Sequence, residues 1–197
     1  MSTKLKSVII NKGTGAGGMN TTINGNSFEN KTDITSILLE KGYEKIFFQK
    51  KSKHNFYFKK TFENKTVIYT CKNGFSYYMK KEYNIDTIRL PDEAYIILYN
   101  DGRKVVKILE KKTQNVEGTV EDKLKNFLYY VLEYKKNLGI DFEVEYAYTM
   151  NNFLKKKVTS ENIKYKIYID ICAENKIKLF YGDDTDYFDN LISWFQS

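Results

Sequence analysis

Asp92, Glu110 and Lys112 are residues whose types and spacing suit metal-assisted chemistry. Asp92 follows the only proline and opens an apolar run, and Glu110 closes the next such run. Magnesium prefers carboxylate oxygens, and once bound it lowers the pKa of a water ligand and stabilises charge on phosphate oxygens. A nearby lysine positions that water or neutralises developing negative charge. Together these residue types predict hydrolysis of a phosphodiester with Mg²⁺.

The chain between the two acids predicts a β-hairpin that brings them together. Residues 92–99 and 103–111 are rich in apolar residues and flank the sequence Asn100-Asp101-Gly102. Asp-Gly between two such runs is a strong hairpin signal, because the central turn residues must tolerate positive φ. Folding of the hairpin places Asp92 and Glu110 at the same end of the strand pair. Ordinary surface ion pairs also arise from acids and lysines near a hairpin, and that alternative stays open.

Successive side chains at the end of the second predicted strand point to opposite faces of the sheet. Glu110 and Lys112 project together while Lys111 points away, so we expect Lys112 to matter far more for cleavage than Lys111. Gln114 follows two residues later on the face of Lys112. We expect it to contact the phosphate or the attacking water, and capping of a neighbouring helix is the alternative.

The remaining patterns predict a single domain over residues 1–197 with an α/β (α+β) fold, in which helices flank a mixed central β-sheet. Besides the hairpin, strands are predicted over 44–49, 54–60, 65–71, 141–148 and 176–181. Helices are predicted over 27–41, 75–83, 120–136 and 184–195. The buried face of the third helix is expected to carry Leu124, Phe127, Leu128, Val131 and Leu132. Residues 161–174 fit both a strand and a helix.

The net charge of +7 and the sequence pI of about 9.1 favour an anionic partner, most often nucleic acid. A lysine-rich solvated surface is the alternative. The single histidine, His54, and the two distant cysteines give little support to a zinc site or a histidine-based triad, and free thiols are the simpler expectation. The apolar run at residues 8–10 is too short for a signal peptide or a membrane span. We therefore expect a soluble, cytoplasmic protein.

Residues 11–26 are dominated by glycine and small polar residues and predict a loop before a helix that begins near Ser27. Three of the glycines match a dinucleotide-binding pattern, but no helix is predicted directly after them, and the Lys-Ser/Thr of a phosphate-binding loop is missing. We expect instead a flexible arm that approaches DNA, with Lys12 and Asn20 as DNA contacts. A plain exposed loop is the alternative.

The segment from Pro91-Asp92 to Glu110-Lys111-Lys112 resembles the PD-(D/E)XK nuclease superfamily, which includes many type II restriction endonucleases. Two further stretches are similar to a small restriction-enzyme-like branch found in bacteria and large DNA viruses. They are GAGGMNTTINGNSFENKTD at residues 15–33 and EKKTQNVEGTVEDKL at residues 110–124. The three pieces agree with that branch in their order along the chain.

The resemblance implies a restriction-endonuclease-like core, with Asp92 and Glu110 as metal ligands, Lys112 as the catalytic lysine and Glu29 as an accessory acid near the metal. The implied activity is Mg²⁺-dependent, site-specific cutting of double-stranded DNA, in the cytoplasm, or in a host cell or virion for a viral chain. A double-strand cut needs two active centres and the chain carries one triad, so we expect a homodimer on DNA. A structure-specific repair or resolvase-type nuclease and a nucleic-acid-binding protein without catalysis stay open as alternatives.

Overall fold

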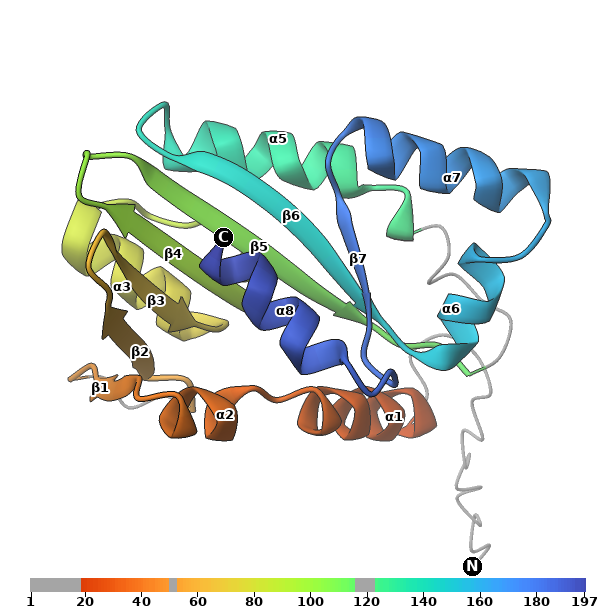
Figure 1. Cartoon of the computed structure of the whole chain (residues 1–197), viewed down its shortest axis with the longest axis horizontal. Helices are drawn as coiled ribbons and strands as arrows, with labels where there is room; N and C mark the ends of the chain where they lie inside the picture. Colours follow the sequence, from red (N-terminus) through yellow and green to blue (C-terminus); the bar gives the residue numbers. More distant parts are fainter. Residues whose placement is uncertain (1–18, 50–52, 116–122) are drawn as a thin grey trace, which may run out of the picture.

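The computed structural model describes residues 19–49, 53–115 and 123–197, with side chains from residue 25 onward. Among these residues a seven-stranded sheet forms the centre of the molecule, in the order β1-β2-β3-β4-β5-β6-β7 (Figure 1). The strands are β1 (Glu44–Phe47), β2 (Phe56–Thr61), β3 (Lys65–Thr70), β4 (Glu93–Tyr99), β5 (Lys104–Lys112), β6 (Glu143–Met150) and β7 (Lys178–Tyr181). The helices are α1 (Met19–Lys31), α2 (Thr35–Glu40), α3 (Asn73–Tyr83), α5 (Phe127–Leu138), α6 (Asn152–Val158), α7 (Ile163–Glu174) and α8 (Tyr187–Gln196).

Strands β1 to β5 form an antiparallel meander, whereas β5, β6 and β7 run parallel to one another. Parallel neighbours need crossover connections, which are usually helical. Helix α5 lies in the crossover from β5 to β6, and α6 and α7 lie in the crossover from β6 to β7. The structure therefore confirms the predicted α/β class, with a mixed central sheet flanked by helices.

Helices cover both faces of the sheet (Figure 1). On one face α3, α5, α6 and α7 pack against the strands in a core that includes Phe75 and Tyr134. On the other face α2 and α8 pack against the strands in a core that includes Leu38 and Phe195. A strand that is covered on both sides reads as a continuous apolar run instead of an alternating one. This explains why residues 94–97 of β4 are all apolar and buried.

The predicted hairpin is present as β4 and β5. Its register pairs Glu93 with Leu109, and one further step along both strands brings Asp92 beside Glu110. The turn differs from the simplest Asp-Gly type, because Gly102, with φ of 93°, is the one residue of the turn with a positive φ. The hairpin prediction is confirmed, and the turn needs the freedom of glycine at a single position.

The start of the first helix differs from its prediction. Helix α1 begins at Met19, so residues 19–26 are helical and not a loop. These residues are mostly glycine, threonine and asparagine, which are weak helix formers. The helix propensities of these residues therefore do not predict that α1 extends back to Met19. The preceding part of the predicted arm, with Lys12, lies outside the described residues.

The predicted helix over 27–41 is divided in two. Thr32 Oγ1 donates to the Phe28 carbonyl at 2.8 Å, and Asp33 Oδ1 accepts the N–H of Thr35 at 2.9 Å. Such local side-chain bonds compete with the regular helical ladder. Both bonds lie where the chain breaks between α1 and α2, and Gly42, with φ of 79°, then follows the end of α2 as expected.

The buried face of α5 also differs from the predicted one. Leu128 and Leu132 are 42% and 56% exposed, whereas Phe127 and Tyr134 are buried. The spacing argument assumes one unbroken helix, but the chain makes a turn at residues 125–126 before α5 begins. That turn changes which side chains face the sheet.

In the second half of the chain the structure resolves one ambiguity and adds one helix. The ambiguous segment 161–174 contains helix α7 (Ile163–Glu174), and the Asn162 side chain caps it by accepting the N–H of Lys164 at 2.9 Å. Helix α6 was not predicted, although Asn151 caps it in the same way. The predicted helix start at residue 120 lies outside the described residues.

Both cysteines, Cys71 and Cys172, are free and buried, in agreement with the expectation of free thiols. Within the described ranges, no helix has the length and apolar character needed to cross a membrane.

Candidate active site between strands β4 and β5

Asp92 and Glu110 meet where β4 begins and β5 ends. Asp92 directly precedes β4, and its Oδ2 accepts the backbone N–H of Lys111 at 2.8 Å. This bond ties the Asp92 carboxylate to the last residues of the neighbouring strand. The structure therefore brings together the two acids that the sequence predicts as metal ligands.

Lys112 completes the group. Its Nζ donates to Glu110 Oε2 at 2.8 Å, and the two side chains are only 21% and 14% exposed. Both residues lie on the face of β5 that also carries the buried Val106 and Ile108, under the layer of α3 and α5. The expected alternation of this strand is confirmed.

The pKa of Glu110 is raised above its ordinary value. Burial is the largest cause, and the neighbouring charge of Asp92 adds to it, while Lys112 and Arg89 act in the opposite direction. Two half-buried carboxylates that repel each other are stabilised by a cation placed between them. The electrostatics of the pair therefore suit a bound metal ion.

Lys111 occupies the opposite face of β5 and is buried. Its Nζ forms an ion pair with Glu93 Oε1 at 2.6 Å and donates to the Thr32 carbonyl at 2.9 Å. The Glu93 carboxylate also accepts the Tyr95 hydroxyl at 2.6 Å. Lys111 thus joins the loop after α1 to both strands of the hairpin, while its N–H holds Asp92. Sequence reasoning missed this role because Lys111 looks like one more surface lysine.

Glu29 is connected to the site by an ion pair with Lys72, a residue that the sequence analysis did not single out. Its Oε2 accepts Lys72 Nζ at 2.6 Å. Lys72 is the residue before α3, and its N–H donates to the Pro91 carbonyl at 2.9 Å, next to Asp92. Burial opposes the charged form of Lys72, but Glu29 and then Asp92 outweigh it and raise its pKa.

Lys72 also has a strained backbone, with φ of 47° and ψ of −123°. A non-glycine residue in this region of φ is uncommon, and such strain gathers at functional sites. Gly74 explains why the turn is so tight, since a Cβ there would lie 2.5 Å from Thr70 Oγ1 and 2.7 Å from the Phe56 carbonyl. The close approach of α3 to the sheet places Lys72 beside the acids.

Arg89 adds a further positive charge on the α5 side. It forms an ion pair with Glu133, and its guanidinium lies 4.1 Å from the centre of the Tyr130 ring. It also lowers the pKa of Glu110, against the stronger effect of burial. Lys112 therefore pairs directly with Glu110, while Arg89 and Lys72 interact electrostatically with Glu110 and Asp92 respectively.

Gln114, Asn20 and Lys12 are the three residues predicted to contact DNA, and the structure describes the side chain of Gln114 alone. Gln114 is buried, and its backbone N–H and carbonyl bond to the side chain of Asn151, at 3.4 and 3.0 Å. Asn20 belongs to α1, but its side chain is not among those described, and Lys12 lies outside the described residues. The structure does not test these DNA contacts.

The donor set fits a divalent cation such as Mg²⁺. Within the described ranges, no cluster of three or more His, Cys, Asp or Glu side chains could hold a metal ion. Magnesium, however, is usually bound by one or two carboxylates together with waters and substrate phosphates. The protein hydrogen bonds engage Oδ2 of Asp92 and Oε2 of Glu110, and among the described residues none engages the second oxygen of either acid. Those two oxygens are suitable metal ligands.

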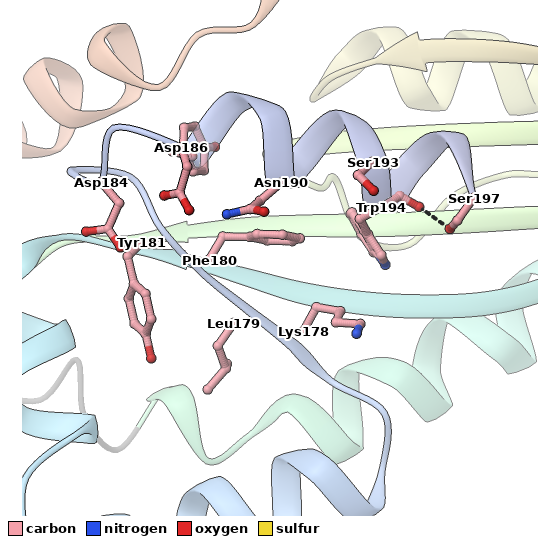
Figure 2. A pocket seen from close by; sticks show the side chains of 11 residues that line it. Lys178, Leu179, Phe180, Tyr181, Asp184, Asp186, Asn190, Ser193, Trp194 and Ser197 are labelled. Carbon is pink, nitrogen blue, oxygen red and sulfur yellow. Dashed lines mark hydrogen bonds between the residues drawn. The ribbon is translucent and has the colours of Figure 1, made fainter.

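A separate groove of about 400 Å³ lies between β7 and α8 (Figure 2). Its lining includes Lys178, Phe180, Asp184 and Trp194, and it includes none of the predicted site residues. One of its acids, Asp184, is already paired with Lys155 at 2.7 Å. The groove is therefore distinct from the carboxylate site.

Comparison with known proteins gives no match, whether with family models, curated proteins or solved structures. Membership of the PD-(D/E)XK superfamily therefore stays a prediction that rests on the sequence motifs.

Proposed function

We propose that this chain is a Mg²⁺-dependent endonuclease that hydrolyses phosphodiester bonds of double-stranded DNA. The observation that carries the proposal is the convergence of Asp92, Glu110 and Lys112 at one end of the hairpin, with Lys112 Nζ 2.8 Å from Glu110 Oε2. The mixed sheet with helices on both faces is compatible with the core that the sequence resemblance implies. The site-specific, restriction-type form of this activity is the finer part of the proposal.

Each residue of the site has a part in this reaction. Asp92 and Glu110 would hold the cation, which would supply water activation and neutralise charge on the phosphate. Lys112 is placed to orient the attacking water or to stabilise the developing negative charge. The backbone N–H of Lys111 fixes the Asp92 carboxylate at 2.8 Å, so the ligand is oriented before the substrate arrives.

The surrounding cations suit a polyanionic substrate. Lys72 directly precedes α3 and pairs with Glu29, Arg89 precedes β4 and pairs with Glu133, and the chain as a whole carries a net charge of +7. Contacts between such cations and phosphates release counterions from DNA and weaken with salt. Because these contacts read no bases, they support binding to DNA in general and leave the recognition sequence open.

The proposal is tested by digesting a sequenced plasmid with and without Mg²⁺. Wild type is expected to cut only with the metal, and Asp92→Asn and Glu110→Gln are each expected to lose roughly 100-fold or more of the rate, because each removes a charged ligand while keeping its shape. Glu44→Gln, on the exposed end of β1, is a matched control and should cut like wild type.

The cleavage pattern separates the possible forms of the activity. Discrete fragments indicate site-specific cutting, whereas preference for branched substrates indicates a structure-specific nuclease. DNA binding without any metal-dependent cutting indicates a binding protein and contradicts the proposal. Cleavage by either acid variant within a few-fold of wild type would show that the site is wrongly assigned.

A further inference from the structure

Helix α7 carries apolar residues on two sides. Its inner side includes the buried Tyr168 and Cys172, which belong to the core on that face of the sheet. On its outer side Ile163, Ile167 and Ile171 are 69%, 51% and 36% exposed. Residues four apart are neighbours on a helix surface, so the three isoleucines form one stripe. Continuous exposed apolar surface marks interaction sites, whereas single exposed apolar side chains are ordinary.

The neighbouring helix α5 also exposes apolar side chains. Figure 1 shows α5 and α7 on the same face of the sheet, and the rings of Phe127 and Tyr168 join the two helices edge-on, with 6.2 Å between the ring centres. Leu128 and Leu132, one turn apart on α5, are 42% and 56% exposed. The layer that these helices form therefore exposes apolar side chains on both of its members.

The charged residues of α7 are divided between its two halves. Lys164 and Lys166 lie in the first half of the helix, and Asp170 and Glu174 lie in the second half. The helix macrodipole favours the opposite order, with acids in the first turn and lysines in the last. The observed order therefore does not stabilise α7 by itself. It does suit a partner helix with the same charges that runs antiparallel to α7.

A second copy of α7 is such a partner. Lys166 and Asp170 are four residues apart, so they lie on the same flank of the isoleucine stripe. When two antiparallel copies cross at Ile167 on a twofold axis, equal flanks face each other, and Lys166 of each copy lies opposite Asp170 of the other. Ile163 of one copy then lies near Ile171 of the other. The stripe therefore complements itself in both shape and charge.

Lys166 already takes part in one ion pair. Its Nζ lies 2.5 Å from Glu161 Oε2, and the two side chains are 52% and 93% exposed. An ion pair between exposed side chains contributes little to stability. Exchange of Glu161 for an acid of a second copy therefore costs little.

We propose that α7 is a self-association surface, through which two copies of this chain pair antiparallel about a twofold axis at Ile167. The inference goes beyond the proposed function and does not depend on catalysis. A contact centred on one helix of 12 residues is small, so the dimer is expected to be weak, with a Kd that is roughly micromolar or higher. Two copies bound to one duplex would have a raised effective concentration, which strengthens the pairing.

Sedimentation of the full chain over a concentration series, without DNA or metal, tests the proposal. Wild type is expected to pass from monomer to dimer as its concentration rises. Ile167→Asp is expected to weaken the dimer by roughly 10-fold or more, because it places two carboxylates at the centre of an apolar contact. Leu39→Asp on α2 is the matched control, since Leu39 is 53% exposed, and this variant should dimerise like wild type.

Charge reversal tests the antiparallel order of the two helices. Lys166→Glu places a glutamate opposite Asp170 of the second copy, and Asp170→Lys places two lysines together. Each single variant is expected to weaken the dimer by about 3- to 10-fold at low salt. The variant with both changes has complementary charges again, so its Kd should return to within a few-fold of the wild-type value.

Several results would overturn the proposal. They are a wild type that stays monomeric up to its highest soluble concentration, a dimer that survives Ile167→Asp, and weakening by the single charge reversals that the double variant does not recover. A lower Tm of Ile167→Asp, at a concentration where wild type is monomeric, would show that the stripe is covered within one chain, and it would also overturn the proposal. None of these assays measures cleavage, so the proposed function is decided separately by the plasmid digestion.

Discussion

Lys111 and Lys112 are neighbours in the chain, but they serve opposite faces of the sheet. Lys112 faces Glu110 and reaches solvent, whereas Lys111 is 6% exposed and pairs with Glu93, which is 3% exposed. Alternation predicts that Lys112 matters more for cleavage than Lys111, and it says nothing about stability. Burial gives Lys111 a structural role, because removing one partner of a buried ion pair leaves an uncompensated charge.

Substitution of Lys111 should therefore lower stability, whereas substitution of Lys112 should lower the cleavage rate. Lys111→Met is expected to lower the free energy of unfolding by about 3–5 kcal/mol, because Glu93 is left charged and buried. Lys112→Met is expected to unfold much more nearly like wild type and to lose roughly 100-fold in cleavage rate. Denaturant unfolding and plasmid cleavage of both variants, at a temperature where both are folded, measure the two effects.

Glu93→Gln combined with Lys111→Met provides the control, since replacing both charges removes the buried mismatch. The double variant should recover part of the lost stability. A Lys111→Met protein that is as stable as wild type would show that the ion pair adds nothing. Equal and mild losses of cleavage in the two single lysine variants would contradict the role given to Lys112.

Only part of the site could be predicted from the sequence at this scale. Asp92, Glu110 and Lys112 belong to one hairpin, so strand alternation and the turn suffice to bring them together. Lys72 directly precedes α3, and Arg89 contacts Glu133 and Tyr130 of α5, so their positions depend on how those helices pack on the sheet. No local pattern in the sequence specifies that packing.

At the scale of elements, α1 is held against the end of β7 by a close contact. A Cβ on Gly182, which follows β7, would lie 2.5 Å from the Thr32 side chain and 2.8 Å from the Phe28 ring. Glu29 is the neighbour of Phe28, so the same contact fixes the acid that pairs with Lys72. The docking of α1 therefore affects the charge arrangement at the site.

Gly182→Ala is expected to destabilise the protein by about 1–3 kcal/mol, as overpacking of a filled core does. It should also lower cleavage, because α1 must move away with Glu29. Gly25→Ala is the matched control on α1 itself, where a Cβ meets nothing within 4 Å. That change should stabilise the helix by up to about 1 kcal/mol. Thermal unfolding and cleavage rates of both variants check this, and a tolerated Gly182→Ala would show that α1 docks loosely.

Elements were predicted well where periodicity is strong and poorly where side-chain bonds intervene. The strands, α3 and α8 follow from their apolar patterns. The Thr32 and Asp33 side chains bond to the backbone at the break between α1 and α2, and a short turn precedes α5, whose buried face differs from the predicted one. Helix α6 is only seven residues long, which is too short for a clear periodic signal.

At the scale of the whole molecule, the proposed function would give each chain one active centre, because Asp92, Glu110 and Lys112 all lie at one end of the β4–β5 hairpin. A cut through both strands of a duplex at one site needs two such centres, facing opposite strands. Two copies related by a twofold axis provide them, and the symmetry then matches a palindromic DNA site.

We therefore expect two chains per duplex in the complex that precedes double-strand cleavage. The protein is mixed with a labelled duplex in Ca²⁺ instead of Mg²⁺, so that the protein–DNA complex forms without cleavage. Analytical ultracentrifugation then gives the number of chains per duplex. The same duplex carrying half of the recognition site is the control, and it should bind one chain, or two with much lower affinity. If a single chain per duplex is found under conditions where both strands are cut together, the dimer is contradicted, and successive nicking by one active centre becomes the better account of the reaction.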